Sequence, residues 1–370
     1  MDQDRLSLLA LHFIPGVGDY LVRQLVSYCG SAARVFETPK GKLLKVPGIG
    51  EVTAAAIKAG NTFREAEAEL AKAEKNDTEI LFFIDKKYPA RLKELDDAPA
   101  LLYYKGNADL NARKSVAIVG TRQATAYGKE IVNQLVEGLK PHGALIVSGL
   151  AYGIDIQAHK QSLLQGLPTV AVMGSGMDVI YPAVHRDVAT KIVHHGALIT
   201  ENHFGTQPDA HHFPARNRII AGLCDALIVV EAAAKGGALI TAEIANSYNR
   251  DVFAVPGSLG STYSEGCNKL IRNNKAVIYT SVKDLEYHLN WTPLDEQHTT
   301  ASGAHADFSH FSEDEQKILR LLKEKGAPMM IDELTIRSAL SPSQLASLLL
   351  TLEFGNVVKS LPGKLFALAK

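Results

Sequence analysis

The sequence is poor in cysteine, and it lacks both a long apolar segment and a signal-peptide pattern. Its three cysteines, Cys29, Cys224 and Cys267, lie far apart and in no Cys-x-x-Cys arrangement. This spacing argues against a disulfide framework and against a thiolate zinc site. No apolar run is long enough to cross a bilayer. The start, MDQDRLSLLA, opens with acidic residues and lacks the charged-then-apolar-then-small pattern of a signal peptide. We therefore expect a cytoplasmic protein that makes no contact with a membrane.

The sequence also has almost no net charge. Its 370 residues include 39 Lys and Arg against 40 Asp and Glu, a formal charge of −1. This balance argues against a protein whose whole surface coats nucleic acid, because such proteins are usually basic. Any anion-binding surface must therefore come from a local cluster of cations. With 46% apolar and 21% charged residues, the composition is that of a globular protein and excludes long disorder and fibrous repeats.

The first sixty residues contain an internal repeat. FIPGVGDYLVRQLVSY at 13–28 and KVPGIGEVTAAAIKAG at 45–60 share a Pro-Gly-x-Gly turn followed by an amphipathic helix pattern. Such a turn leaves free N–H groups at the start of a helix, where a phosphate can bind. Residues 1–62 resemble a tandem helix-hairpin-helix domain, a fold that usually grips the DNA backbone, but a small helical bundle with Pro-Gly connectors fits equally well. The charged segment 62–75 is predicted to be a solvent-exposed connecting helix.

Residues 63–290 are predicted to form an α/β core with a doubly wound, mostly parallel sheet. Continuous apolar runs alternate there with helical segments, and their lack of period-two alternation indicates strands that are buried on both faces. Four of the runs from residue 115 onward end in glycine. Ligands of such sheets bind beyond the carboxyl ends of the strands at a topological switch point, so we expect the site there. The predicted strands are 78–84, 100–106, 115–120, 144–149, 169–174, 197–201, 226–231, 252–257 and 276–280.

The C-terminal part is predicted to be a linker followed by a small domain. Residues 291–312 contain many small polar residues and little periodicity, as is typical of linkers. Residues 313–370 have the pattern of three helices and a hairpin that turns at Pro362-Gly363, the layout of a winged helix. The helix in the recognition position, 342–354, contains no Lys or Arg. Because DNA contacts need cations, a structural or protein-contact role is the better prediction for this domain.

Three turns that follow apolar runs in the core carry residue types that bind phosphate. The first combines glycine, threonine and arginine, which offer backbone N–H groups, a hydroxyl and a guanidinium to one anion. The second consists of small residues that let a ligand approach the backbone, and the third places a lysine beside two glycines. The candidate contacts in these turns are Gly120, Thr121, Arg122, Ser148, Gly149, Ala151, Lys235, Gly236 and Gly237.

Two arginines near the start of a predicted helix form a fourth candidate group. Arg216 and Arg218 flank Asn217 in the motif FPARNRIIAGL at 213–223. Cations gain nothing from the helix dipole at that end, so their expected partner is an external anion or a buried carboxylate. Glu201 and Glu231, at the ends of predicted strands, are the internal competitors for the two arginines.

Signatures of cofactor binding are incomplete. The pair Gly128-Lys129 comes eight residues after Gly120 and is followed by Glu130 in place of Ser or Thr, so it is not a Walker A loop. A Gly-x-Gly-x-x-Gly fingerprint is also lacking. These departures support neither ATP hydrolysis nor ordinary NAD binding, and we expect no cofactor.

Catalytic and metal-binding signatures are weak as well. Asp155 and His159 are four residues apart on a predicted helix, where a catalytic dyad and a plain hydrogen-bonding role are both open. Five histidines crowd one stretch, but in none of the spacings typical of zinc sites, so we expect no metal. These are His194, His195, His203, His211 and His212.

Taken together, the motifs resemble one family. Six motifs stand in the order and spacing of the DNA-processing protein A family, also called DprA or Smf. They are GTR, SGLAYGID, VMGSGMDVIYP, FPARNRIIAGL, KGGALIT and DVFAVPG. The resemblance implies an extended Rossmann-like core that binds single-stranded DNA in natural transformation and loads RecA recombinase onto it as a homodimer. It also implies phosphate contacts from the candidate groups above. Tyr152, Phe204 and Phe213 could then stack on bases.

An enzyme and a pure scaffold remain as alternatives. The core also resembles Rossmann-like phosphoribohydrolases that cleave cytokinin-type nucleoside monophosphates and carry the motif PGGxGTxxE. Here KGGALITAE has no proline before its glycines, and Leu-Ile replaces the later glycine. We therefore expect no catalytic residues and no enzyme activity. For a pure scaffold, the groove would be incidental to function.

Overall fold

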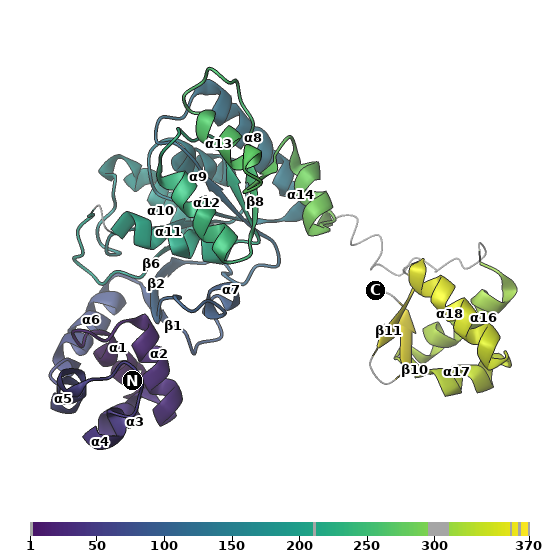
Figure 1. Cartoon of the computed structure of the whole chain (residues 1–370), viewed down its shortest axis with the longest axis horizontal. Coiled ribbons are helices and arrows are strands. Elements are labelled where there is room, and N and C mark those ends of the chain that lie inside the picture. The colour runs from purple at the N-terminus through teal and green to yellow at the C-terminus, as the bar shows by residue number, and fades with distance from the viewer. Residues whose placement is uncertain (1–2, 210–211, 295–310, 356, 362–363, 369–370) are drawn as a thin grey trace. The chain divides into compact units, whose positions relative to one another are not determined.

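The computed structural model describes two compact parts of the chain. Residues 1–291 form the first unit and residues 292–370 form the second (Figure 1). Most of the predicted linker, residues 295–310, lies outside the part that is described. The described residues are 3–209, 212–294, 311–355, 357–361 and 364–368. None of the helices in these ranges has the length and apolar character needed to span a bilayer.

Six helices open the first unit. The two Pro-Gly turns connect the first helix to the second and the fourth to the fifth, as the repeat predicts. Gly16 and Gly48 in these turns have φ angles of +81° and +85°, a conformation that favours glycine. The helices are α1 (Gln3–His12), α2 (Asp19–Cys29), α3 (Ala32–Glu37), α4 (Lys40–Leu43), α5 (Glu51–Ala59) and α6 (Phe63–Lys75).

The first Pro-Gly turn and the helix that follows it lie against the core. Asp19, in the first turn of α2, accepts a hydrogen bond from the backbone N–H of Ala100 at 2.9 Å. Arg23, one turn further on, donates to the carbonyl oxygens of Leu95 and Lys93 at 2.8 and 2.7 Å. The start of α2 is therefore used for packing within the protein, which favours the bundle interpretation for this hairpin.

Helix α6 is more than the exposed connector that its charged sequence predicts. It packs against α1 and buries Ala66, Glu69 and Ala73 along one face. The Glu69 carboxylate accepts hydrogen bonds from the Tyr103 hydroxyl at 2.9 Å and the Phe204 backbone N–H at 2.7 Å. Burial raises the pKa of Tyr103, which keeps its hydroxyl protonated and able to donate. The prediction of a solvated helix was wrong because the residues spaced three and four apart face inward.

A nine-stranded sheet forms the centre of the first unit, with the order β1-β2-β6-β5-β4-β3-β7-β8-β9. β1 and β2 pair antiparallel with their neighbours, and all other neighbouring strands of this sheet are parallel. The mostly parallel sheet is thus confirmed. The strands are β1 (Glu79–Phe82), β2 (Leu101–Gly106), β3 (Ser115–Val119), β4 (Leu145–Gly149), β5 (Thr169–Val172), β6 (Gly196–Thr200), β7 (Ala226–Val229), β8 (Asp251–Ala254) and β9 (Val277–Ile278).

Helices cover both faces of this sheet (Figure 1). One face packs against α7 (Ala90–Lys93), α11 (His212–Leu223), α12 (Gly237–Ser247) and α13 (Glu265–Arg272). The other packs against α8 (Ala126–Leu139), α9 (Ile154–Gln165), α10 (Arg186–His195), α14 (Val282–Leu289) and the N-terminal helices. Short 3₁₀ turns span Lys140–His142 and Ala183–His185. Because both faces are buried, most positions of the strands are apolar, as the continuous runs predict.

The second unit is a winged helix. It has the three helices and the final pair of strands that the sequence predicts, and one short further strand between the first two helices. Its three-stranded sheet has the order β10-β12-β11. The expected hairpin turn at Pro362-Gly363 lies outside the described residues. The elements are α16 (Glu313–Lys325), β10 (Met329–Met330), α17 (Ile331–Ser338), α18 (Pro342–Phe354), β11 (Val358–Leu361) and β12 (Leu365–Leu368).

Candidate functional site

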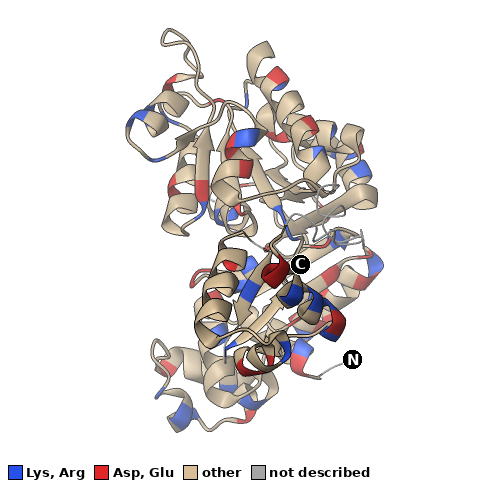
Figure 2. Cartoon of the chain, turned by 90° about the vertical axis from the view of Figure 1, so that its right-hand side faces the viewer, with Lys and Arg blue, Asp and Glu red and all other residues tan. Residues whose placement is uncertain are grey.

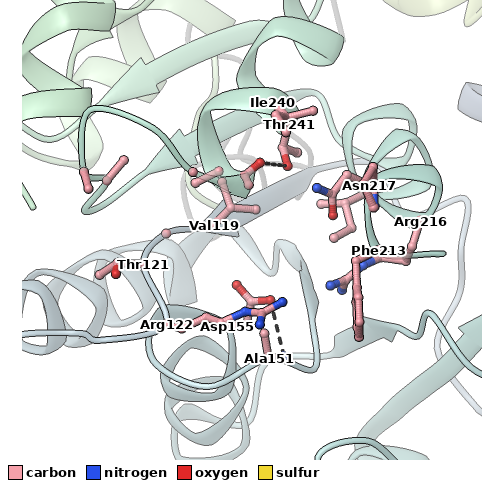
Figure 3. A pocket seen from close by; sticks show the side chains of 18 of the residues that line it. Val119, Thr121, Arg122, Ala151, Asp155, Phe213, Arg216, Asn217, Ile240 and Thr241 are labelled. Atoms are coloured by element: carbon pink, nitrogen blue, oxygen red, sulfur yellow. Dashed lines mark hydrogen bonds between the residues drawn. The ribbon is translucent and has the colours of Figure 1, made fainter. Parts of the chain in front are cut away.

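A cleft of about 640 Å³ opens beyond the carboxyl ends of β3, β4 and β7 (Figure 3). β3 lies between the other two in the sheet, so the chain order reverses here. This is the topological switch point at which the sequence predicts a site. The predicted site residues that line the cleft are Gly120, Thr121, Arg122, Ala151, Phe213, Arg216, Asn217, Lys235, Gly236 and Gly237.

A buried charged pair forms the floor of the cleft. The Arg216 side chain is directed toward Asp155 (Figure 3) and donates from Nη1 to the carbonyl oxygen of Val172 at 2.8 Å. Asp155 accepts a long hydrogen bond, 3.4 Å, from the backbone N–H of Ala151. Burial raises the pKa of Asp155, and the positive charge of Arg216 opposes that rise. Burial likewise lowers the pKa of Arg216, whose Nε lacks a hydrogen-bond partner among the described residues.

Arg122 and two aromatic rings form one wall of the cleft. The guanidinium carbon of Arg122 lies 5.4 Å from the ring centroid of Phe213. The Phe213 ring is 5.9 Å from that of Tyr181, whose side chain is 46% exposed. Arg122 is exposed and forms no ion pair with any residue that the structure describes. The wall therefore combines an exposed cation that has no ion-pair partner among the described residues with two aromatic rings.

The start of α12 forms the opposite lip. A Cβ atom on Gly236 or Gly237 would meet no heavy atom within 4 Å, so the backbone here borders open space. Gly236 precedes the helix without a side-chain cap, which leaves the first N–H groups of α12 free of a side-chain partner. The exposed Lys235 beside them forms no ion pair within the described ranges. Backbone donors and a free ammonium group together suit a phosphate.

The structure corrects the role of Arg218, which the sequence places at the same site. Its guanidinium donates to the carbonyl oxygen of Asp97 at 2.5 Å and pairs with Glu201 and, at 3.4 Å, with Asp19. Burial raises the pKa of Glu201 to about 7, and the charge of Arg218 opposes this rise. The predicted phosphate contact was wrong because Arg218 joins the N-terminal helices to the core through these carboxylates. The expected competitor Glu201 is confirmed as a partner.

Ser148 and Phe204 are corrected as well. Ser148 is fully buried in β4 and donates to the carbonyl oxygen of Ile118 at 2.6 Å. Phe204 is 5% exposed and packs edge-on against Tyr103, with ring centroids 5.6 Å apart. Neither lines the cleft, because one faces into the sheet and the other belongs to the core beneath α6. Tyr152, in contrast, is half exposed and borders a small cavity that adjoins the cleft.

The structure adds residues that sequence reasoning missed. Tyr181 lines the cleft beside Phe213, and Ile240 and Thr241 line it from α12. The sequence did hold a signal for Tyr181, because it is an aromatic residue that precedes a proline in the loop after a glycine-ended strand. No pattern in the sequence distinguishes Ile240 from the buried apolar residues of α12.

The titratable groups that suggested catalysis have structural partners instead. His159 is fully buried and bonds to the Thr169 hydroxyl at 2.7 Å and the Gly149 carbonyl at 2.8 Å. Burial lowers the pKa of His159 to about 4. The dyad with Asp155 is therefore replaced by a hydrogen-bonding role. No cluster of His, Cys, Asp or Glu that could hold a metal occurs within the described ranges, and His211 lies outside them.

Two glutamates near the cleft also have internal partners. Glu231 accepts hydrogen bonds from the Thr125 backbone N–H at 2.9 Å and from its hydroxyl at 2.6 Å, at the start of α8. It is therefore not the competitor for Arg216 and Arg218 that its position at a strand end suggests. Both oxygens of Glu243 bind the Lys275 ammonium, at 2.6 and 2.8 Å.

Alanine substitutions at Gly149 and Gly236 are expected to have opposite effects. A Cβ on Gly149 would lie 1.7 Å from Nη1 of Arg216 and 2.4 Å from Oδ2 of Asp155. Gly149→Ala should therefore displace the buried pair and lower the free energy of unfolding by about 1–3 kcal/mol. Gly236→Ala meets no neighbour and should unfold like the wild type, while weakening any ligand that touches the backbone. Urea denaturation of both variants tests this, and equal stability losses would contradict it.

The comparisons with known proteins agree with this architecture. The family model described as DNA recombination-mediator protein A matches residues 79–290, and the DprA winged helix model matches 300–364. Protein Smf of Synechocystis is 32% identical over 386 residues, which cover 96% of each chain. DprA of Streptococcus pneumoniae is 46% identical over 202 residues, 55% of this chain and 71% of that protein.

Solved structures give the same result. The X-ray structure of DprA from Streptococcus pneumoniae matches with a TM-score of 0.68 at 36% identity, covering 78% of this chain and 98% of the other. A DprA structure from Helicobacter pylori, determined for its single-stranded DNA binding mode, matches with a TM-score of 0.52 at 30% identity. That match covers 58% of this chain and 95% of the other. With its α/β core and winged helix both matched, the chain belongs to the DNA recombination-mediator protein A family, whose members are named DprA or Smf.

Proposed function

We propose that this recombination mediator binds single-stranded DNA in the cleft and passes the strand to RecA recombinase. One observation carries the binding proposal. Arg122 and Lys235 are exposed cations that line a single cleft and form no ion pair among the described residues. They lie beside the rings of Phe213 and Tyr181 and the open backbone N–H groups at the start of α12. Cations that track phosphates and rings that accept bases are what single-strand binding requires.

The near-neutral charge of the chain is compatible with this function. Basic and acidic residues are interspersed along the ribbons (Figure 2), and the formal charge of the chain is only −1. The cleft instead concentrates uncompensated cations at one place. The Helicobacter pylori relative, whose structure was determined for its single-stranded DNA binding mode, supports the assignment of the ligand.

Binding should be tolerant of base sequence. Phosphate oxygens can be bound by Lys235, Arg122 and the N–H groups at the start of α12. Bases of any kind can stack on the rings of Phe213 and Tyr181. We expect an anisotropy titration to give higher affinity for single strands than for duplexes, similar values for unrelated sequences, and weaker binding at high salt. Equal affinity for duplexes, or no binding, would reject the proposal.

The hand-over to RecA and a homodimeric state rest on family membership. We expect the protein to increase the rate of RecA assembly on single-stranded DNA, and sedimentation to give the mass of two chains. An unchanged rate of RecA assembly would limit the function to strand binding.

We also propose that the cleft performs no glycosidic-bond hydrolysis. Glu243, which occupies the last position of the motif KGGALITAE, is held by Lys275. Incubation with nucleoside monophosphates should therefore release no free base on chromatography. Release of base would instead assign the cleft to a phosphoribohydrolase.

A further inference from the structure

A second cleft of about 550 Å³ adjoins the first on the far side of the α12 N-terminus. It lies between the first turns of α12 and helix α13. The two clefts share Lys235, Gly236, Gly237 and Ile240 in their linings. A chain that leaves the first cleft over the glycine pair therefore enters the second directly.

We propose that bound single-stranded DNA continues over the start of α12 into this second cleft, where Lys269 contacts a backbone phosphate. This inference rests on the proposed function, because it extends the path of the same strand. It assigns a second nucleotide subsite to a surface outside the topological switch point.

The charge of the second cleft suits a phosphate backbone. Lys269 of α13 is exposed and has no ion-pair partner in the described ranges. Asn273, one helical turn further on, adds an exposed amide to the same lining. Lys275 is present too, but Glu243 neutralises it through both carboxylate oxygens. Lys235 and Lys269 thus remain as uncompensated cations, one at each side of the cleft mouth.

The floor of the second cleft suits bases. Leu239, Ile240 and Leu270 contribute apolar surface, and Ile240 is 48% exposed. Apolar contact with a base needs no matched hydrogen-bond donors or acceptors, so it places no restriction on sequence. An apolar floor between two cations provides for the two chemical parts of a nucleotide, its base and its phosphate. An apolar protein partner would leave both lysines without a counter-charge.

The test measures affinity against strand length. Anisotropy titrations with oligothymidylates of increasing length would compare the wild type with Lys269→Ala, Glu243→Gln and Lys283→Ala. Lys283 is a matched control, because it is an exposed lysine on α14, which covers the other face of the sheet.

Short strands that fill only the first cleft should bind Lys269→Ala as tightly as the wild type. Longer strands should bind it about tenfold more weakly, as expected for a lost hydrogen bond to a charged group, with a salt slope lower by about 0.7. Glu243→Gln should act in the opposite direction, because it leaves Lys275 uncompensated and so strengthens binding of the longer strands alone. Lys283→Ala should match the wild type at every length.

The inference is overturned if Lys269→Ala and Glu243→Gln both match the wild type at all lengths. It is also overturned if sedimentation shows that Lys269→Ala weakens binding only by changing the oligomeric state, since the cleft would then be a contact between copies. In either case, weaker binding of short strands by an Arg122→Ala, Lys235→Ala double variant would leave the proposed function intact. Absence of strand binding by the wild type would reject the proposed function and this inference together.

Discussion

Replacing Arg122 and Lys235 together with alanine is expected to lower the affinity for single-stranded DNA by about tenfold for each cation removed. The two side chains approach the cleft from different loops, one after β3 and the other before α12. Neither forms an ion pair within the described part of the chain, so their replacement breaks no ion pair that stabilises the fold. The loss should therefore appear mainly in binding, and the free energy of unfolding should fall by no more than about 1 kcal/mol through the lost contact of Arg122 with Phe213.

The dependence on salt identifies the mechanism. Each phosphate contact with a single strand contributes about 0.7 to the slope of log K against log salt, so the double variant should lower the slope by about 1.4. The loss should be similar for unrelated base sequences, because phosphates carry no sequence information. Titrations at several salt concentrations measure both quantities.

A matched double variant provides the control. Lys160 on α9 and Lys283 on α14 are exposed lysines on helices that cover the other face of the sheet. Their replacement by alanine removes the same charge without touching the cleft, and it should leave the slope near that of the wild type. An equal effect of both double variants would mean that general charge, and not the cleft, attracts the strand.

Replacing Glu69 with alanine is expected to lower the free energy of unfolding of the first unit by about 3 kcal/mol. The Glu69 carboxylate is 4% exposed and accepts hydrogen bonds from the Tyr103 hydroxyl and the Phe204 backbone N–H. Its removal would leave two buried donors without their acceptor. Because burial raises the pKa of Tyr103, its hydroxyl stays protonated and remains a buried donor without an acceptor.

Glu67→Ala is the matched control for this variant. Glu67 lies two residues away on the same helix and is exposed, so its replacement should change stability by no more than about 0.5 kcal/mol. Urea unfolding can be followed through Trp291, the single tryptophan of the sequence, which packs against the core of the first unit. Equal stability of the two variants would contradict a structural role for the buried carboxylate.

The elements of this fold were predictable because their signals are local. Apolar runs such as those at 115–120 and 226–231 indicate buried parallel strands, and the structure places β3 and β7 there as neighbours. The Pro-Gly repeats mark both N-terminal hairpins. Ligand sites of doubly wound sheets lie beyond the carboxyl ends of the strands at a switch point, so the position of the cleft was predictable as well. The winged helix followed from the order of its helices and hairpin.

The partners of individual side chains were not predictable in the same way. Arg216 and Arg218 are two residues apart in one motif, yet one lies in the floor of the cleft and the other pairs with Asp19, 199 residues away in the sequence. Phe213 and Phe204 are both aromatic residues of the same region, but only Phe213 lines the cleft.

The sequence by itself determined the elements, the class of sheet, the family resemblance and the edge of the sheet at which the cleft opens. Only the tertiary structure decided which cations form ion pairs, that Glu69 is buried, and that a second cleft adjoins the first. The physical reason is the range of the interactions. Periodicity and turn chemistry act between residues a few positions apart, whereas ion pairing and burial depend on residues that meet only when the chain has folded.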